Sequence, residues 1–330
     1  MICYAWRDRL DGEDRAAAEQ LVTEAAAYDA DAGFAVLDTR DVRAVAAAGT
    51  RVWHLPIKAR KDLRGGADAP MVLVAYLRLT VDEDGQGTVG YTVHPGYRSR
   101  GVTTQLVEEL GLEVSVPGGW QGTGATALRC WAFGSHPAAQ RLTRRFGIAA
   151  VARLWTLLRH LTGPFAMPLD DDPLPAGYEL SEPLDLADPG VAARIEALAG
   201  QAALTSAQAD RFAEDVADRH GSALIATHDG KDAGFAWFDP AVLPHAEWSA
   251  GWVRALMVDP AARGAGLGAA LLTRALHAVA AGGAQVALLR VDPDNRAAVR
   301  MCRLRSFEQD EAHACYQLGE WDDPPVFARP

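Results

Sequence analysis

The chain has 330 residues, 49% of them hydrophobic, which is long enough for two domains that each bury a core. Its 32 basic and 43 acidic side chains give a net charge of −11, and a negative field of this size argues against nucleic acid as a partner. No apolar run is long enough to span a membrane, and the N-terminal residues lack the apolar core of a signal peptide, so we expect a cytoplasmic protein.

The cysteines and histidines indicate neither a disulfide nor a metal site. The four cysteines, Cys3, Cys130, Cys302 and Cys315, show no paired spacing, so we expect reduced thiols. The nine histidines are scattered and form no His-x-x-x-His or Cys/His cluster, so we expect no bound metal.

The N-terminal half predicts a series of strands and helices. Alternating residues at 71–80 and 88–93 indicate two paired strands joined by an Asp- and Gly-rich turn. The segment HPGYRSRG (94–101) then leads into a helix with a periodic apolar face. A strand, a helix and a last strand are expected at 125–133, 136–147 and 153–161.

The segment GPFAMPLDDDPLPAG (163–177) predicts a linker. It contains four prolines and three consecutive aspartates. Because proline fixes φ and lacks a backbone donor, neither a helix nor an inner strand runs through it. We therefore expect an N-terminal domain at 1–162 and a C-terminal domain at 178–330.

The C-terminal half predicts two helices, at 190–199 and 206–219, and then a β-hairpin at 222–238 that turns at Asp229-Gly230. A strand at 251–258 leads through a glycine-rich stretch into a further helix. A strand, a helix and a last strand are expected at 285–291, 294–305 and 312–318.

The order of the elements is the same in both halves. Arg98 and Gly101 of the first half have counterparts in Arg263 and Gly266, 165 residues later. Each pair follows a predicted strand and precedes a predicted helix. These matches indicate an internal duplication and an α/β protein of two tandem domains.

The stretch VDPAARGAGLG (258–268) places three glycines at the start of a predicted helix. A helix start exposes unpaired N–H groups and carries partial positive charge, and glycine lets an anion approach these donors. Arg263 adds a guanidinium that can bind a phosphate. The stretch therefore predicts a diphosphate site between a strand and a helix.

Three interpretations of these glycines compete. They can form a tight strand-to-helix turn without any ligand. They also fit the G-x-G-x-x-A pattern of a Rossmann dinucleotide site, with Gly264, Gly266 and Ala269. However, five residues separate the strand from the first glycine, and only about sixty residues follow, too few for the rest of a doubly wound sheet. The third interpretation is an acyl-CoA site.

The run Arg263-Gly264-Ala265-Gly266-Leu267-Gly268 resembles motif A of the GCN5-related N-acetyltransferases (the GNAT superfamily), written Q/R-x-x-G-x-G/A. The segment DPDNRAAVRMCRLRSF (292–307) is similar to a second motif of this superfamily, with Asn295, Ala298 and Phe307 in register. The resemblance implies the GNAT fold for each half, a mixed α/β sheet that is splayed at its middle and covered by helices on both faces.

The same resemblance implies the co-substrate, acetyl-CoA or another acyl-CoA, and the residues that bind it. The diphosphate would lie on residues 263–268. The pantetheine arm would be aligned by Leu256, Met257 and Val258 and oriented by Asn295.

Most of the chain is similar to the mycothiol synthases, a tandem GNAT family. Trp6-Arg7, the weaker first motif and the intact second motif carry this resemblance, which is most specific at 251–318. That family transfers an acetyl group from acetyl-CoA to the cysteinyl amine of a glucosamine-inositol conjugate. The resemblance implies an N-acyltransferase, monomeric or homodimeric, for a primary amine of a small molecule. Such an enzyme is either mycothiol-synthase-like or a relative that tailors a natural product or modifies an antibiotic.

Two positions depart from the pattern. Trp252 stands where mycothiol synthases carry a glutamate base, and Cys302 stands where many GNATs carry a tyrosine acid. His245 and Glu247, just before the strand, are the candidate replacement bases, although an amine of low pKa needs none. Cys302 either protonates the leaving sulfur or fills space as a small buried residue. These losses keep a second possibility open, a non-catalytic acyl-CoA-binding or regulatory protein.

The N-terminal copy of the motif is weaker. Its candidate cofactor-binding residues are Val93, Arg98, Ser99, Arg100, Gly101, Val102 and Thr103. Ser99 and Thr103 replace two glycines of the C-terminal motif, and His136 replaces the asparagine. This half is therefore either a structural domain that shapes the acceptor groove or a domain that binds CoA without catalysis. We expect the C-terminal domain to be the active one.

Overall fold

The structure is a computed structural model that describes residues 2–30, 37–61, 69–134, 137–169, 171–201, 212, 216, 220–321 and 323–325. The chain divides into two compact units, unit 1 (Met1–Arg153 with His313–Pro330) and unit 2 (Leu154–Ala312). Within the described ranges no helix is both long and apolar enough to cross a membrane.

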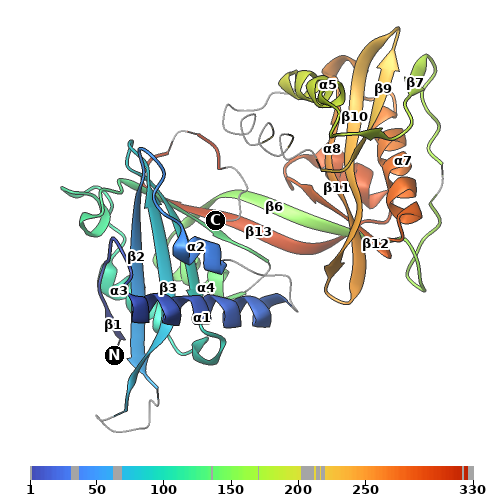
Figure 1. Ribbon diagram of the computed structural model, residues 1–330. Coiled ribbons are helices and arrows are strands. Elements are labelled where there is room, and N and C mark those ends of the chain that lie inside the picture. Colours follow the sequence, from blue (N-terminus) through green and yellow to red (C-terminus); the bar gives the residue numbers. More distant parts are fainter. Residues whose placement is uncertain are drawn as a thin grey trace. The chain divides into compact units, whose positions relative to one another are not determined.

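Unit 1 is a mixed sheet with helices on both faces (Figure 1). Its strands lie in the order β1-β2-β3-β4-β5-β13, and every neighbouring pair is antiparallel except the parallel pair β4 and β5. The strands are β1 (Ile2–Tyr4), β2 (Arg51–Arg60), β3 (Met71–Val81), β4 (Gln86–Val93), β5 (Ala127–Ala132) and β13 (Glu308–Leu318). The helices are α1 (Gly12–Ala30), α2 (Thr39–Arg43), α3 (Val102–Leu110) and α4 (Pro137–Phe146).

Alternate residues of β3 pack against different helices. Tyr76 lies in one core with Leu21 of α1. Its neighbour Leu77 lies in another core with Leu106 of α3. Because successive side chains of a strand point to opposite faces, this strand is covered by helices on both sides.

Unit 2 repeats the plan. Its strands lie in the order β6-β12-β11-β10-β9-β7, with β8 also on β9, and only β11 and β12 are parallel. The strands are β6 (Ala149–His160), β7 (Tyr178–Leu180), β8 (Leu184–Asp185), β9 (Ser222–His228), β10 (Lys231–His245), β11 (Trp248–Val258) and β12 (Val286–Val291). The helices are α5 (Pro189–Gly200), α7 (Leu267–Ala281) and α8 (Arg296–Arg303).

Two cores cover the sheet of unit 2. Leu271 of α7 is fully buried in a core with Phe238 of β10. On the other face, Ile195 of α5 is buried with Phe235 of the same strand. The mixed sheet with helices on both faces, expected for each half, is thus confirmed.

The expected linker, 163–177, contains neither helix nor strand in its described residues. Part of it is held on unit 2 by Asp172, whose Oδ2 accepts hydrogen bonds from Thr273 Oγ1 (2.5 Å) and Arg305 Nε (2.8 Å). These bonds attach the linker to α7 and to the end of α8.

The two units exchange their last strands, and their boundaries therefore differ from those expected at 162 and 178. Residues 155–160 of β6 follow unit 1 in the chain but pair with β12 of unit 2. Residues 314–318 of β13 follow unit 2 but pair with β5 of unit 1. Sequence patterns indicate strands but not their partners, so the exchange could not be predicted from them.

The predicted elements are confirmed from residue 71 onward wherever the structure describes them. The hairpin turns as expected, because Asp229 (φ 51°) and Gly230 (φ 73°) both adopt the left-handed conformation. Sequence analysis missed α1, which is rich in alanine, together with α2 and the strands β1, β2, β7 and β8. Most of the helix expected at 206–219, and His136, lie outside the described residues.

Candidate functional site

The sheet of unit 2 opens between its two parallel strands. β11 and β12 pair over four residues, the last being Val253 opposite Leu289. Beyond this point Leu256, Met257 and Val258 pair with β10 only. Their backbone edge toward β12 therefore has no strand partner and can bind an extended ligand.

A β-bulge lies where the strands begin to separate. Trp237 of β10 pairs with Ala255, but the next residue, Phe238, pairs with Val253. Arg254 is therefore an extra residue with no partner on β10. Such a bulge reorients the local peptide groups and is common beside active sites.

The glycine-rich stretch forms an open cradle at the end of β11. Gly264 (φ 84°) and Gly266 (φ 96°) are left-handed, and Gly266 caps α7. A Cβ built on either glycine would meet no atom within 4 Å, so the space in front of them is open. In this fully described stretch, the N–H groups of residues 264–269 donate no hydrogen bond to the protein. The cradle thus fits a diphosphate, which needs close approach to unpaired donors.

Arg263 lies at the mouth of this cradle. Its Nε donates to the carbonyl oxygen of Val258 (3.1 Å), which fixes the side chain on the end of β11. The residue is exposed, and no carboxylate within the described ranges pairs with it. Its positive charge is therefore available to a phosphate. Gly268 brings α7 close to β11, since a Cβ there would lie 3.4 Å from Val258.

The corresponding cradle of unit 1 has the same backbone but a different charge. Arg98 Nε donates to Val93 (3.1 Å), and Gly101 (φ 81°) caps α3. Ser99 takes the left-handed conformation of Gly264 with φ 59°. However, the guanidinium of Arg98 forms two bonds to the carboxylate of Asp29, at 2.5 and 2.8 Å. Its charge is thus neutralised within the unit.

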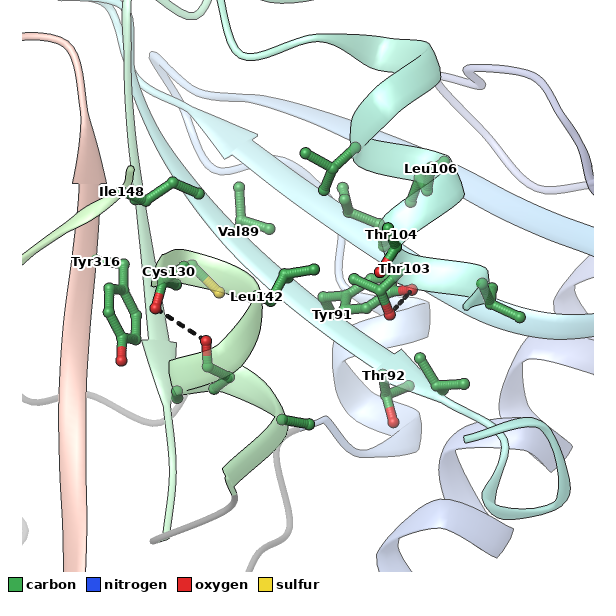
Figure 2. Close-up of a pocket in the computed structure, with 18 of the residues that line it drawn as sticks. Val89, Tyr91, Thr92, Thr103, Thr104, Leu106, Cys130, Leu142, Ile148 and Tyr316 are labelled. Atoms are coloured by element: carbon green, nitrogen blue, oxygen red, sulfur yellow. Dashed lines mark hydrogen bonds between the residues drawn. The ribbon is translucent and has the colours of Figure 1, made fainter. Parts of the chain in front are cut away.

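Unit 1 also contains a cavity of about 700 Å³ (Figure 2). It lies where β4 and β5 separate, beyond their last pair of Thr88 and Arg129. Most of the side chains that line it are apolar, and they come from β4, β5, β13, α3 and α4. Examples labelled in Figure 2 are Val89, Leu106, Cys130, Leu142, Ile148 and Tyr316.

Some of the polar groups that line this cavity form hydrogen bonds with one another. Thr103 forms a 3.0 Å hydrogen bond with the hydroxyl of Tyr91, drawn as a dashed line in Figure 2. Burial raises the pKa of Tyr91, so its hydroxyl stays protonated. Sequence analysis did not find the cavity, because its wall includes Tyr316 from the distant β13.

Of the remaining candidates of the N-terminal motif, two line the same cavity and Arg100 does not. Arg100 is exposed and lies 5.1 Å from the ring centre of Tyr97. Val102 is buried at the start of α3 and, like Val93, lines the cavity.

His245 and Glu247 are not brought to the opening of the unit 2 sheet. His245 pairs with Trp248, and Glu247 lies in the turn between β10 and β11. The opening begins after Val253, about 16 Å along the strand from Trp248 at roughly 3.3 Å per residue. A 2.7 Å hydrogen bond to Asp310 raises the pKa of His245 and occupies its Nε2.

Cys302 and Asn295 belong to α8. Cys302 is 2% exposed within the core that α7 forms, and burial raises the pKa of its thiol to about 11. The environment is that of a small core residue, and a role as proton donor stays a prediction. Asn295 caps α8, with Oδ1 accepting from the N–H of Ala298 (3.1 Å), which leaves its amide NH₂ available.

Trp252 faces two guanidinium groups. The Cζ atoms of Arg254 and Arg290 lie 5.5 and 4.8 Å from its ring centre. No side chain in this group of three can accept a proton at neutral pH. Within the described ranges, no group of three or more His, Cys, Asp or Glu side chains could hold a metal ion.

Comparison with known proteins agrees with this geometry. A family model described as the acetyltransferase (GNAT) family matches residues 193–307, which include the cradle of unit 2. The chain is 30% identical to a mycothiol acetyltransferase of Actinosynnema mirum, over 96% of this chain and 100% of that protein. It is 32% identical to a mycothiol acetyltransferase of Salinispora arenicola, over 94% and 95% of the two chains.

Solved structures show the same fold over the whole length. A tandem GNAT protein from the clavulanic acid biosynthesis pathway has a TM-score of 0.60 at 18% identity and covers 98% of this chain and 100% of its own. A GCN5-related N-acetyltransferase from Sphaerobacter thermophilus has a TM-score of 0.57 at 19% identity, with 95% of each chain covered. The chain therefore belongs to the GNAT acetyltransferases, as a tandem, acyl-CoA-dependent member related to the mycothiol acetyltransferases.

Proposed function

We propose that unit 2 transfers an acetyl group from acetyl-CoA to a primary amine of a small molecule. The observation that carries this proposal is the open cradle of residues 264–269, with the unpaired Arg263 at its mouth. The match of the GNAT family model to residues 193–307 supports the same unit.

Each part of the site has a role in positioning acetyl-CoA, which supplies an acyl thioester. Arg263 and the N–H groups of 264–269 would bind the diphosphate. The open edge of Leu256, Met257 and Val258 would align the pantetheine arm, and Asn295 would orient it from α8. A backbone N–H at the bulge of Arg254 would stabilise the oxyanion, so the rate enhancement comes chiefly from orientation and fixed dipoles.

The similar proteins indicate the chemical class of the acceptor but not its identity. Two of the similar proteins are mycothiol acetyltransferases, and one similar structure belongs to clavulanic acid biosynthesis. The face beside the opening carries Trp252 in contact with two arginines, where the mycothiol synthases carry a glutamate. We infer a small amine related to, but distinct from, the mycothiol precursor, as in natural-product tailoring.

A charge reversal tests which unit is active. Arg263→Glu places a negative charge at the diphosphate, so we expect acetyl-CoA binding to unit 2 and turnover to be lost. Arg98→Glu should leave turnover largely intact. Calorimetric titration of acetyl-CoA measures binding, and release of free CoA thiol with a panel of primary amines, including a cysteinyl glucosaminyl inositol, measures turnover. If Arg98→Glu stops turnover and Arg263→Glu does not, unit 1 is the active one.

The same assay addresses the alternative of a non-catalytic protein. A wild-type protein that binds acetyl-CoA but releases no thiol with any amine of the panel is a binding or regulatory protein. In that case the cradle is a ligand site without an acceptor site.

The cavity of unit 1 favours a second candidate function for that unit. The cavity has a volume of about 700 Å³ and lies beside the unpaired N–H groups at the start of α3. We propose that it can hold an acyl-CoA without catalysis, weakly because Asp29 neutralises Arg98. Titration would then give two sites per chain, and Arg263→Glu would leave the weaker one. A single site that disappears in Arg263→Glu would exclude this role.

A further inference from the structure

An acceptor amine of ordinary pKa enters at neutral pH as an ammonium ion, and a group beside the opening that takes its proton speeds the reaction. The strand pairs next to the opening present one such group. Asp239 of β10 is directly opposite Trp252 of β11, one residue before Val253 ends the pairing with β12. Paired residues on antiparallel strands lie on the same face with Cβ atoms about 5 Å apart. Asp239 therefore lies on the face of Trp252, at the point where the sheet opens.

This face is the one opposite α7. Val253 belongs to the core under α7, whereas its neighbour Trp252 packs with the group on the other side of the sheet. The two faces of the sheet therefore have different roles. The side of α7 carries the diphosphate cradle, and the side of Asp239 is left for the acceptor.

The carboxylate of Asp239 is oriented but not saturated. Its Oδ1 accepts from the N–H of Ala241 (3.0 Å), and its Oδ2 lies 3.3 Å from Nη2 of Arg254. An ionised carboxylate has about four acceptor sites, so room remains for an ammonium ion or a water molecule. The side chain is 17% exposed, which keeps it within reach of solvent. Arg254, the bulge residue, holds it beside the opening.

The other charged groups on this face are less well placed. Arg290 of β12 contacts the ring of Trp252 and takes no proton. Glu311 of β13 accepts a hydrogen bond from Thr156, and Thr156 pairs with Arg290, so Glu311 is two strands beyond β12. His245, bound to Asp310, is near the far end of β11.

We propose that Asp239 is the proton acceptor of the acetyl transfer and that Arg254 is its positioning residue. This inference rests on the proposed function of unit 2. The acceptor R–NH₃⁺ gives one proton to Asp239, directly or through a water molecule, and Asp239 passes it to solvent. The neutral nitrogen forms the C–N bond to the acetyl carbon, and the C–S bond breaks with its electron pair on sulfur. The second proton leaves nitrogen and ends on sulfur, which gives the amide and free CoA thiol.

The test compares Asp239→Asn with wild type, using the amine of the panel that turns over fastest. We expect kcat to fall about 100-fold, the usual worth of a general base, while acetyl-CoA binding is unchanged. The pH dependence of the rate distinguishes the loss of a proton acceptor from a structural effect of the substitution. In Asp239→Asn the rate should rise with pH until the amine itself is neutral, whereas wild type levels off at lower pH. Asp239→Glu should restore part of the rate, and Arg254→Lys should keep more than Arg254→Gln.

Asp232→Asn is the matched control. Asp232 lies on the same strand and also pairs with an arginine, Arg194, but it is opposite Thr227 and seven residues from Asp239, about 23 Å at roughly 3.3 Å per residue. We expect this variant to keep the wild-type kcat and pH profile. A second variant, Trp252→Glu in the Asp239→Asn background, returns a carboxylate to the opposite position and should raise the rate.

The outcomes separate this inference from the proposed function. Wild-type turnover together with an unchanged Asp239→Asn variant overturns the role of Asp239 alone. The same holds if His245→Gln or Glu247→Gln reproduces the loss and Asp239→Asn does not. A wild-type protein without turnover on any amine overturns both proposals.

Discussion

Two arginines at equivalent positions show how much a single distant residue changes. Arg98 and Arg263 both donate through Nε to the end of the preceding strand, at 3.1 Å in each unit. Only Arg98 pairs with a carboxylate, that of Asp29 on α1, which is 69 residues away in the chain. The motifs therefore predict the same local geometry, but the charge offered to a phosphate depends on a tertiary contact.

A buried histidine predicts how unit 1 responds to acid. His54 is 5% exposed and its Nδ1 lies 2.7 Å from the hydroxyl of Tyr76. Burial, helped by the charge of Arg78, lowers the pKa of His54 to about 4. An unfolded chain binds this proton near pH 6.5, so the unfolded state is favoured as pH falls from 6.5 toward 4.

We therefore expect the contribution of His54 to the free energy of unfolding to be complete above pH 6.5. Between pH 6.5 and 4 this contribution should fall by about 1.4 kcal/mol per pH unit. Urea unfolding at several values between pH 7.5 and 4.5 measures the effect. His54→Gln, which does not titrate, should show a shallower decline than wild type. Equal slopes in the two proteins would mean that His54 does not control the acid response.

At the scale of elements, local signals were sufficient where one turn or one helix end decides the conformation. The hairpin between β9 and β10 was predicted from Asp229-Gly230, and the start of α7 from Gly264 and Gly266. These glycines are left-handed, a conformation that costs other residues about 1–2 kcal/mol. The placement of a glycine is thus a physical requirement that can be recognised in the sequence.

The two ends of α7 allow this requirement to be tested separately from binding. Gly266 (φ 96°) and Gly283 (φ 90°) flank the same helix, and a Cβ at either position would meet no atom within 4 Å. Replacing either by alanine should therefore destabilise unit 2 by about 1 kcal/mol through backbone strain alone.

Only Gly266→Ala should also weaken acetyl-CoA binding, because a methyl group there enters the space of the diphosphate. Thermal unfolding compares the stability of the two variants, and calorimetric titration compares their affinities. Equal affinity for acetyl-CoA in both variants would place the diphosphate elsewhere.

At the scale of the whole molecule, the two units are not two consecutive halves of the chain, because unit 1 also contains a C-terminal segment. The last strand of the chain, β13, completes the sheet of unit 1 through its pairs with β5. It also anchors Arg129, whose Nε donates to Gln317 (2.8 Å) and whose guanidinium lies 4.1 Å from the ring centre of Trp321. The stability of unit 1 thus depends on residues from the opposite end of the sequence.

A truncation at residue 307 should therefore unfold strands far from the cut in the chain. Without β13, the N–H and C=O groups of one edge of β5 lose their partners. We expect amide hydrogen exchange to accelerate in peptides of β5, while peptides of α7 stay protected. A chain that ends at residue 325 keeps β13 and serves as the control. Unchanged protection of β5 in the shorter chain would show that this pairing adds no stability.

The sequence by itself determined most of the strands and helices from residue 71 onward, their repeated order in the two halves, and the left-handed glycines at the start of α7. Each of these depends on residues that are close in the chain, such as the alternation of a strand or the glycines of a helix start. The same patterns carried the family resemblance that the comparisons confirmed.

Only the tertiary structure decided which strands pair, which arginine keeps its charge free, and which carboxylate lies opposite Trp252. Asp239 is thirteen residues from Trp252, and its proximity follows from the register of two strands and a bulge. The cavity of unit 1 requires Tyr316 beside Cys130, residues that are 186 positions apart in the sequence. Such contacts arise when strands pair across long stretches of chain, and a local pattern contains no information about the partner.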